Sequence, residues 1–243
     1  MFSIFKKKNP LVTDLSWLGV DIHSHLLPGI DDGAKDIEES ISYIKNLHDL
    51  GFYKLICTPH IFTELYPNTR ETIVPAAEKV QSALAVENVN VKIEYAAEYM
   101  IDDVFKVEKG LMTLPGDYIL VEMSYLSENP NIEAIVFGLQ IEGYKVILAH
   151  PERYNFYHKN LHRFSRLKEM GCLFQINLLS TVGYYGKNVK IAYEYLLKHK
   201  LYDFAGTDLH HEKHLSILKT TVQNGEMFKL IGDYPFKNLE IFG

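Results

Sequence analysis

The sequence predicts an α/β fold in which parallel strands and the helices between them form a single barrel. Short apolar runs alternate with longer segments whose apolar residues recur every three or four positions, a pattern typical of βα units. Residues that can bind a metal follow most of the apolar runs, which is where active sites of such barrels lie. The chain has 243 residues, 47% of them hydrophobic, and no Pro/Gly/Ser-rich linker. We therefore expect one domain over residues 17–243, preceded by a flexible arm at 1–16.

The first half of the chain predicts four strands and three helices. Leu18, Val20 and Ile22 alternate with other residues before His23 and His25, so a buried strand ends at this pair of histidines. The helix that follows begins at Asp36, a good N-cap residue, and Gly51 ends it. The expected strands are 18–22, 53–57, 91–97 and 118–121, and the expected helices are 36–50, 70–87 and 130–142.

The second half repeats this alternation. Apolar runs at 146–149, 172–176 and 202–205 predict three more strands, which brings the total to seven. Helices are expected at 159–170 and 188–199, and a last one is expected to begin near His214.

Composition excludes several classes of function. The formal net charge is −6 and the pI is near 6.0, so the chain is not built to coat nucleic acid. Cys57 and Cys172 lie in apolar runs, which favours buried free thiols in a reducing compartment, and we expect a cytoplasmic protein. No apolar run is long enough to span a membrane, and Lys6, Lys7 and Lys8 lack the apolar stretch of a signal peptide.

Residues that can bind a metal follow six of the seven predicted strands. Because the strands of a parallel barrel share one carboxyl-terminal face, these side chains are expected to meet there. His23 and His25 illustrate the geometry, since alternate residues of a strand point to the same side. A mixed set of histidines and carboxylates suits zinc, manganese or iron, and this set exceeds what one ion needs. Its members are His23, His25, His60, Glu98, Glu122, His150, Asp208 and His210, with Asp31 or Asp32 in the loop after the first strand.

Each of these residues also has an ordinary structural explanation. A single histidine is more often a hydrogen-bonded polar side chain than a ligand, and a single glutamate more often forms a salt bridge. We apply this explanation to the histidines on predicted helices, and two histidines near the last site loop stay undecided. The first group is His48, His158, His162 and His199, and the second is His211 and His214. For the strand-end residues as a set, a metal site explains the pattern better.

Seven short motifs resemble those of the polymerase and histidinol phosphatase (PHP) superfamily. In order from about residue 18 to 214 they are Val20-Asp21-Ile22-His23-Ser24-His25, Pro28-Gly29-Ile30-Asp31-Asp32-Gly33, Thr58-Pro59-His60, Ala97-Glu98, Val121-Glu122, Ala149-His150-Pro151-Glu152-Arg153-Tyr154 and Gly206-Thr207-Asp208-Leu209-His210. The Asp-Asp-Gly loop before a Glu-rich helix start and the Ala-His-Pro-Glu-Arg-Tyr motif favour its CpsB/CapC branch, the capsule-polysaccharide tyrosine-protein phosphatases. The resemblance implies a distorted seven-stranded (β/α)7 barrel similar to a TIM barrel, three divalent ions, and hydrolysis of phosphotyrosine by a metal-bridged hydroxide. Manganese is the expected metal, with iron or zinc as alternatives.

The resemblance also implies a role for each site residue. The first ion would be held by His23, His25, Glu98 and Asp208, the second by Glu98, Glu122 and His150, and the third by Asp32, His60 and His210. Asp31 is the alternative to Asp32, because adjacent carboxylates cannot be separated by sequence alone. Arg153 would bind the phosphate through its planar fork of donors.

Two further expectations follow from the family. Many relatives carry a second arginine after the Asp-x-His segment, and Lys213 or His214 is the candidate replacement here. The expected partner is a phosphotyrosine protein, the C-terminal tyrosine cluster of a bacterial membrane tyrosine kinase, whose dephosphorylation would regulate capsule synthesis. Four loop aromatics are candidates to bracket the substrate ring, namely Phe62, Tyr66, Tyr99 and Tyr125.

Several rival functions share part of this evidence. A histidinol-phosphate or other small phosphomonoester phosphatase would use the same metals. An exonuclease needs a basic stripe that the chain lacks, and a non-catalytic partner of polysaccharide export has no need of nine ligands. An amidohydrolase commonly uses a mid-barrel lysine where Glu122 stands. A cysteine phosphatase is excluded, because neither Cys57 nor Cys172 begins a Cys-x5-Arg motif.

Overall fold

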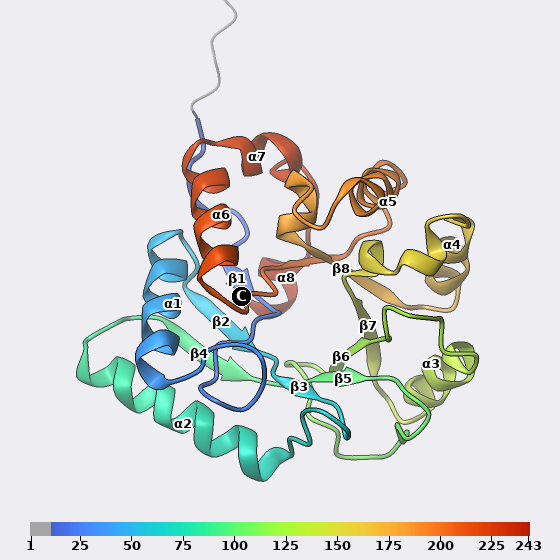
Figure 1. Cartoon of the computed structure of the whole chain (residues 1–243), viewed down its shortest axis with the longest axis horizontal. Coiled ribbons are helices and arrows are strands. Elements are labelled where there is room, and N and C mark those ends of the chain that lie inside the picture. The colour runs from blue at the N-terminus through green and yellow to red at the C-terminus, as the bar shows by residue number, and fades with distance from the viewer. Residues whose placement is uncertain (1–10) are drawn as a thin grey trace, which may run out of the picture.

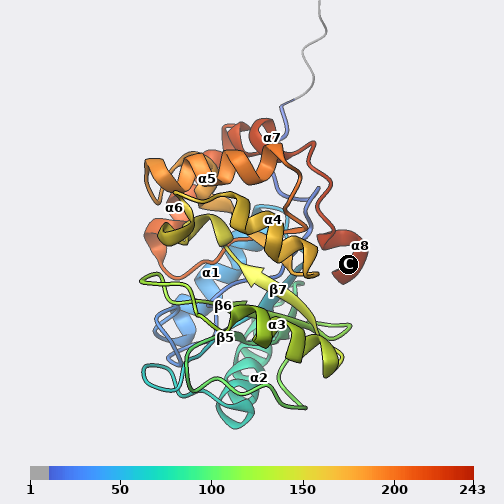
Figure 2. The same ribbon diagram turned by 90° about the vertical axis from the view of Figure 1, so that its right-hand side faces the viewer.

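Strands and helices alternate along the chain, with the strands at the centre and α1 to α6 distributed around them (Figures 1 and 2). The computed structural model describes residues 11–243. The strands are β1 (Val20–Asp21), β2 (Lys54–Cys57), β3 (His60–Ile61), β4 (Lys92–Tyr95), β5 (Glu98–Met100), β6 (Tyr118–Glu122), β7 (Lys145–Ala149), β8 (Leu173–Asn177) and β9 (Phe204–Gly206). The α-helices are α1 (Ile37–Asp49), α2 (Arg70–Val86), α3 (Ile132–Ile141), α4 (His162–Glu169), α5 (Lys187–Lys198), α6 (Glu212–Gln223), α7 (Glu226–Ile231) and α8 (Asn238–Phe242).

The strands form two parallel sheets rather than the single closed seven-stranded barrel that the sequence predicted. The smaller sheet has the order β1-β2-β4, and the larger has the order β3-β5-β6-β7-β8-β9. The predicted strand at 91–97 divides into β4 and β5, which lie in different sheets. β3 was not predicted at all. The parallel βα alternation is correct, and the expectation of one continuous sheet is wrong.

The division has a local cause beside the site. Thr58 and Pro59 separate β2 from β3, and a proline has no N–H to donate to a sheet. Ala96 and Ala97 separate β4 from β5 at the corresponding point of the neighbouring strand. Single hydrogen bonds still cross the gaps, since Ala96 N donates to the Cys57 carbonyl and Glu98 N to the Pro59 carbonyl. The chain therefore leaves the regular sheet just before His60 and Glu98.

The first and last strands approach each other beyond their ends. Ser24 and Leu209 form an isolated parallel bridge. Asp208 N donates to the His23 carbonyl at 2.8 Å, and His25 N donates to the Leu209 carbonyl at 3.1 Å. These bonds hold the His-Ser-His segment beside the Asp-Leu-His segment, although about 185 residues separate them in sequence.

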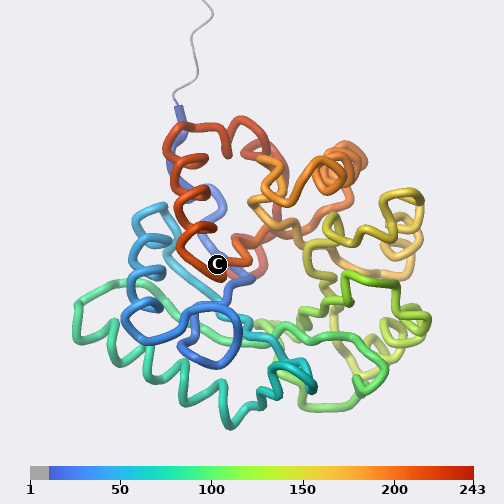
Figure 3. The backbone as a smooth tube through the Cα atoms, in the orientation of Figure 1, coloured from blue at the N-terminus to red at the C-terminus, as the bar shows by residue number. Residues whose placement is uncertain are grey.

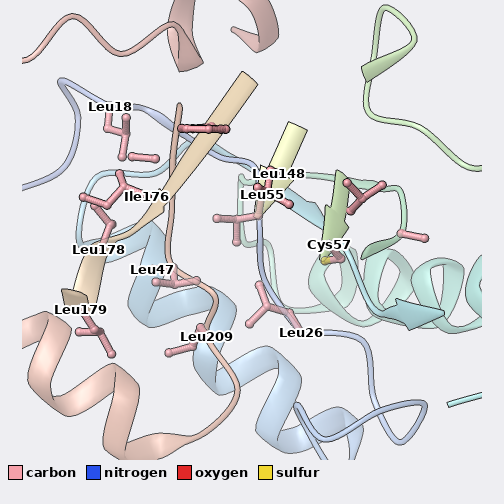
Figure 4. Close-up of a cluster of buried hydrophobic side chains, with 14 of the residues drawn as sticks. Leu18, Leu26, Leu47, Leu55, Cys57, Leu148, Ile176, Leu178, Leu179 and Leu209 are labelled. Carbon is pink, nitrogen blue, oxygen red and sulfur yellow. The ribbon is translucent and has the colours of Figure 1, made fainter. Parts of the chain in front are cut away.

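The core lies between the strands and the helices that surround them. The predicted cap of α1 is confirmed, because the Asp36 carboxylate accepts from Glu39 N at 2.8 Å. α1 buries Ile41, Ile44 and Leu47 on one side, at the spacing expected of an amphipathic helix. Figure 4 shows Leu47 in a cluster of buried side chains from distant segments, which also contains Leu18, Leu55, Leu148, Ile176 and Leu209.

Both described ends of the chain pack onto the domain. Residues 1–10 of the predicted arm lie outside the described residues. Leu15, in the rest of that arm, is buried, and its N–H donates to the Leu50 carbonyl. α8, which the sequence analysis did not predict, lies against β1 (Figure 3), where Asn238 Nδ2 donates to the carbonyls of Val20 and Ala205. Within residues 11–243, no helix is both long and apolar enough to cross a membrane.

Candidate metal centre

All nine predicted metal-binding residues converge at the carboxyl-terminal ends of the strands. Six follow or end a strand, His60 and Glu98 begin β3 and β5 just after β2 and β4, and Asp32 lies in the loop between β1 and α1. Eight of the nine contribute ligand atoms to three overlapping groups, and within each group every atom lies within 4.8 Å of the others; His150 lies outside these groups. The groups are His23, His25, Glu98 and Asp208; His25, Asp32, His60 and His210; and His60, Glu98 and Glu122.

The first group is fully buried. His23 Nε2 lies 3.1 Å from Glu98 Oε2 and 3.3 Å from Asp208 Oδ1. His25 Nε2 lies 3.4 and 3.3 Å from the same two oxygens. The two Nε2 atoms are only 3.3 Å apart, so both imidazoles face one point.

Two hydrogen bonds fix which nitrogen of each ring faces that point. His23 Nδ1 lies 2.8 Å from Gln175 Oε1, and His25 Nδ1 lies 2.8 Å from Asp31 Oδ2. Both partners are acceptors, so each Nδ1 carries a proton and each Nε2 faces the shared point. The two Nε2 atoms, 3.3 Å apart, repel each other unless a proton or a metal ion lies between them. Gln175 and Asp31 therefore orient the two histidines so that their Nε2 atoms could bind a metal.

Glu98 shows the same need for a cation. Its Oε2 is buried and lacks a hydrogen bond of good geometry among the described residues. It lies 3.1 Å from His23 Nε2, 3.4 Å from His25 Nε2 and 3.2 Å from His60 Nδ1. A buried carboxylate oxygen without a donor is costly, and three imidazole nitrogens around it form a ligand set. The residues present fit a divalent ion at this point.

The electrostatic field of the cluster also favours positive charge. Burial lowers the pKa of His23, but the carboxylates of Glu98 and Asp208 outweigh burial and raise that pKa to about 9. The carboxylates of Asp31, Asp32 and Glu122 add to the negative charge of the same cluster. A metal ion would replace the proton that this field otherwise attracts.

The resemblance implied a second group of Glu98, Glu122 and His150, whereas the structure groups Glu98 and Glu122 with His60. His60 Nδ1 lies 3.1 Å from Glu122 Oε1 and 3.2 Å from Glu98 Oε2. The resemblance had placed His150 here instead. His150 Nε2 lies 3.2 Å from Glu98 Oε1 but 3.9 Å from Glu122 Oε2, at the edge of the group. Glu98 belongs to two groups, the position expected of a bridging carboxylate.

The third group separates the two adjacent aspartates. Asp32 Oδ1 lies 3.5 Å from both His60 Nε2 and His210 Nε2, and the Asp32 side chain is 50% exposed. Asp31 is buried and its oxygens accept from His25 Nδ1, Gly33 N and His60 N. Asp31 is thus occupied in positioning its neighbours, and the geometry favours Asp32 as the ligand.

Backbone geometry supports a specialised site. His150 and Asp208 have positive φ values of 31° and 49°, which non-glycine residues rarely adopt. Such strain costs about 1–3 kcal/mol per residue and is concentrated at functional sites. Gly33 is required for a different reason, because a Cβ there would lie 2.0 Å from the His25 carbonyl oxygen. The loop of Asp31 and Asp32 can therefore close against the histidines only with glycine at this position.

Arg153 reaches the cluster from the short 3₁₀ helix Pro151–Arg153 that follows β7. Its Nη1 donates to Asp208 Oδ2 at 2.6 Å, and its guanidinium lies over the rings of Tyr125 and Tyr185, at 4.8 and 4.3 Å from their centroids. Asn177 Nδ2 donates to the same Asp208 oxygen at 2.8 Å. Neither Tyr185 nor Asn177 was predicted, because an asparagine is not a metal-ligand type and Tyr185 follows none of the motifs that carry the ligands. Asn177 is nevertheless the last residue of β8, and Gln175 lies two residues before it.

A cavity of about 230 Å³ opens beside the cluster. Arg153 and three of the four predicted aromatics line it, namely Phe62, Tyr66 and Tyr125. The Tyr66 ring is stacked on His60 with centroids 5.5 Å apart. The prediction for Tyr99 is wrong, because its side chain is buried outside this cavity and its hydroxyl accepts from Met112 N.

The remaining sequence candidates do not line this cavity. Lys213 is exposed and its Nζ lies 5.4 Å from the Tyr184 ring centroid. His214 is buried, with its Nδ1 3.4 Å from His210 N. Neither takes the place of a second phosphate-binding arginine. His48 and His158 bond to main-chain carbonyls, as their ordinary explanation predicts.

The two cysteines are free and buried, as predicted. Cys57 lies in the hydrophobic cluster (Figure 4). Burial raises the pKa of each thiol to about 12. Both are therefore protonated at neutral pH, which excludes a thiolate nucleophile.

Comparison with known proteins identifies the family. The profile described as capsular polysaccharide synthesis, CpsB/CapC, matches residues 19–220. The tyrosine-protein phosphatase YwqE of Bacillus subtilis is 30% identical over 200 residues, covering 80% of this chain and 78% of YwqE. The tyrosine-protein phosphatase CpsB of Streptococcus pneumoniae is 28% identical over 200 residues, covering 79% of this chain and 82% of CpsB.

Solved structures agree with this assignment. One described as YwqE from Bacillus subtilis and CpsB from Streptococcus pneumoniae, "unique metal-dependent tyrosine phosphatases", superposes with a TM-score of 0.77 at 26% identity, covering 92% of this chain and 95% of that one. A histidinol phosphate phosphatase from Lactococcus lactis shares the fold at a TM-score of 0.56 and 15% identity, covering 90% of this chain and 94% of that one. The chain belongs to the CpsB/CapC family of capsular polysaccharide synthesis, as its strand-end motifs predicted.

Proposed function

We propose that this protein is a metal-dependent protein-tyrosine phosphatase that removes phosphate from a phosphotyrosine protein in the control of capsule or exopolysaccharide synthesis. The observation that carries the proposal is the buried pair of inward-facing imidazoles, His23 and His25, beside the unsatisfied Glu98 oxygen. Family membership and the tyrosine phosphatase names of the relatives support the reaction.

The nine clustered residues would hold the ions. We propose three divalent ions, manganese by preference, with His23, His25, Glu98 and Asp208 on the first. The two overlapping groups give candidate ligands for the others, and Glu98 would bridge two ions. When bound, such ions supply a nucleophilic hydroxide at neutral pH and neutralise charge on a phosphoryl group.

Arg153 would bind and orient the phosphate. One of its five N–H donors is used by Asp208, and the guanidinium lines the cavity beside the ligands. A planar fork of donors matches two oxygens of a phosphoryl group. The contacts with the Tyr125 and Tyr185 rings hold the fork in place before substrate arrives, which is the preorganisation that stabilises a transition state.

The aromatic wall of the cavity suits a phenyl ring. Phe62 and Tyr66 from the loop after β3 and Tyr125 from the loop after β6 all line this cavity. A tyrosine phenolate has a pKa of about 10, so it leaves with modest help from an acid, and water at the open cavity can give that proton. The cavity residues would therefore need only to hold the ring and the phosphate in the orientation required for hydrolysis.

The proposed partner is the C-terminal tyrosine cluster of a bacterial membrane tyrosine kinase, and the proposed location is the cytoplasm. The family's place in capsular polysaccharide synthesis supports the partner. The two free thiols support a reducing compartment.

A substrate panel tests the reaction. The manganese-loaded protein should hydrolyse phosphotyrosine peptides far faster than phosphoserine peptides or histidinol phosphate. Glu98→Gln, prepared in parallel, should be inactive on all three, which excludes a contaminating phosphatase. Faster hydrolysis of histidinol phosphate would favour the small-phosphomonoester alternative, and no hydrolysis of any substrate would refute the proposal.

A further inference from the structure

A second cavity adjoins the candidate metal centre. It has a volume of about 600 Å³ and lies between the segment after β3 and the segment after β5, which run side by side in Figures 1 and 2. We call it the flanking cavity. Its lining includes Ile61, Thr63, Tyr99, Met100, Asp102, Asp103, Val104, Phe105, Lys106, Glu108 and Leu111.

The wall between the two cavities follows from strand geometry. Alternate residues of an extended segment point to opposite sides. His60 and Phe62 line the cavity at the metal centre, and Ile61 and Thr63 line the flanking cavity. Met100, at the end of β5, lines both. The two cavities therefore share a boundary at Met100, directly beside the position proposed for the phosphotyrosine ring.

The flanking cavity is held in shape by hydrogen bonds rather than formed by a free loop. Asn129 Nδ2 donates to the carbonyls of Ile101 and Asp102 at 3.0 and 3.3 Å. Asp102 Oδ1 accepts from Val104 N at 3.0 Å, and the Tyr99 hydroxyl accepts from Met112 N at 2.7 Å. A cavity that is already formed binds a ligand without the entropy cost of ordering its own backbone.

The lining combines an apolar surface with an acidic rim. Val104 is 49% exposed, and Phe105 and Leu111 are partly exposed beside it. Asp102, Asp103 and Glu108 contribute three carboxylates, against the single ammonium of Lys106. Such a surface is complementary to a large apolar side chain accompanied by a basic one.

We infer that the flanking cavity binds residues adjacent to the phosphotyrosine and selects a polypeptide with a large apolar side chain and a basic residue near the phosphorylated tyrosine. The inference rests on the proposed function. An extended peptide advances by about 3.3–3.6 Å per residue, so positions one to three from the phosphotyrosine can reach past Met100. A small phosphomonoester would fill only the cavity at the metal centre, so the flanking cavity distinguishes a polypeptide substrate.

The test uses phosphotyrosine peptides with an otherwise alanine-rich sequence. Leu or Lys is placed singly at each of the three positions on either side, and kcat/KM is measured with the manganese-loaded protein. At the best position, Leu should raise kcat/KM by about 10-fold over Ala, the order expected for burial of a large apolar side chain. Phe105→Ala should abolish most of that gain. The double variant Asp103→Asn, Glu108→Gln should reduce the preference for Lys about 3- to 10-fold, and added salt should do the same in the wild type.

A matched control comes from another surface cavity of similar size. The cavity beside α7, of about 610 Å³, also carries a phenylalanine and two carboxylates, Phe228, Glu226 and Asp233. Phe228→Ala and the double variant Glu226→Gln, Asp233→Asn should leave peptide selectivity unchanged. All variants should hydrolyse free phosphotyrosine at the wild-type rate, because none of these side chains lines the cavity at the metal centre.

The outcomes separate this inference from the proposed function. If wild type hydrolyses phosphotyrosine but shows no flanking preference, or if the flanking-cavity variants leave the preference intact, the inference is overturned and the phosphatase stands. An equal loss on free phosphotyrosine and on peptides would also overturn it, because the residues would then support the centre rather than select the peptide. If free phosphotyrosine itself is not hydrolysed, the proposed function fails first.

Discussion

Gln175 fixes the orientation of the His23 ring, one of the two inward-facing imidazoles. It is fully buried in β8, its Oε1 accepts from His23 Nδ1, and its Nε2 donates to the Ile176 carbonyl at 2.5 Å. Without it, the His23 ring could exchange tautomers or rotate, and the Nε2 lone pair would no longer point at His25. Positioning residues of this kind are as much a part of a metal centre as the ligands.

Gln175→Ala should weaken manganese binding about 10- to 100-fold, the usual cost of losing the hydrogen bond that orients a metal-binding histidine. Affinity is measured by competition with a metal-sensitive dye. The matched control is Gln140→Ala, since Gln140 Nε2 donates to the Met170 carbonyl just after α4, away from the candidate ligands, and its loss should leave metal affinity unchanged. Equal metal affinity in the Gln175 variant would show that His23 does not need this partner.

Substitution of Arg153 tests whether its guanidinium binds the phosphate. Arg153→Lys keeps the charge but loses the planar fork, so the turnover number for a phosphotyrosine peptide should fall about 10- to 1000-fold. Metal content and melting temperature should change little. Arg163→Lys is the control, because Arg163 is likewise ion-paired, with Glu128 and Glu133, but does not line the cavity. Wild-type turnover in Arg153→Lys would mean that the fork does not contact the phosphate.

The thiols provide a test of mechanism. The double variant Cys57→Ala, Cys172→Ala should retain most phosphatase activity, because both thiols are buried and protonated at neutral pH. Alanine is preferable to serine here, since a buried hydroxyl without a partner would destabilise the core. Activity is compared at equal folded fraction, checked by circular dichroism. Complete loss of activity in the folded double variant would contradict a hydroxide mechanism.

At the scale of elements, the site depends on where strands are interrupted. β3 and β5 each begin with a site residue, His60 and Glu98, immediately after a break in the smaller sheet. Residues 60 and 98 are register partners in the larger sheet. The breaks therefore place an imidazole and a carboxylate side by side at the mouth of the strands, where Glu98 can contact ligands from β1 as well.

The loop of Asp31 and Asp32 leads into the amino-terminal end of α1. The Asp36 cap at that end is therefore expected to stabilise the helix next to the site. Asp36→Ala should lower the free energy of unfolding by about 1 kcal/mol, because it removes the side-chain acceptor for Glu39 N. Urea unfolding measures the change. Asp49→Ala, at the carboxyl-terminal end of the same helix, is the control and should be neutral or stabilising by about 0.3–0.5 kcal/mol, since a carboxylate there opposes the helix dipole. Equal effects of the two substitutions would contradict the cap.

At the scale of the whole molecule, the candidate metal centre lies where the first and last strands of the fold approach each other. His23 and His25 follow the first strand, and Asp208 and His210 follow the last. The Ser24–Leu209 bridge and hydrogen bonds from Thr207 to the Asp21 carboxylate join the two segments. Ions bound between these segments would hold the first and last βα units together. The centre is therefore expected to contribute to global stability as well as to catalysis.

Metal removal should reveal that contribution. Exhaustive chelation should abolish phosphatase activity and lower the melting temperature, and manganese should restore both. At 100 times its Kd, a ligand that binds only the folded state stabilises that state by about 2.7 kcal/mol. His60→Ala should reduce the manganese-dependent rise in melting temperature, and His199→Ala, at the end of α5, should not. Unchanged melting and turnover in protein shown to be metal-free would refute the metal dependence.

The sequence by itself determined the alternation of strands and helices through α6 and the residues that could bind a metal. Helical and strand periodicities gave α1 to α6 nearly to the residue, because local capping and amphipathic spacing fix those elements. The positions of His23, His25, Glu98, Asp208 and their partners could be predicted because parallel βα units all turn their strand ends to one face. That rule needs no knowledge of distances.

Only the tertiary structure decided which of those residues could bind a metal directly and which position their neighbours. Asp31 and Asp32 are chemically identical neighbours, and their roles separate only when one is buried against His25 and the other faces the cavity. Gln175, Asn177 and Tyr185 carry no metal-ligand signature, so their contacts with His23, Asp208 and Arg153 could not be foreseen. The split into two sheets was not predicted, although Pro59 marks one of the breaks, because the sheet that a strand joins depends on hydrogen bonds to neighbours that are distant in sequence.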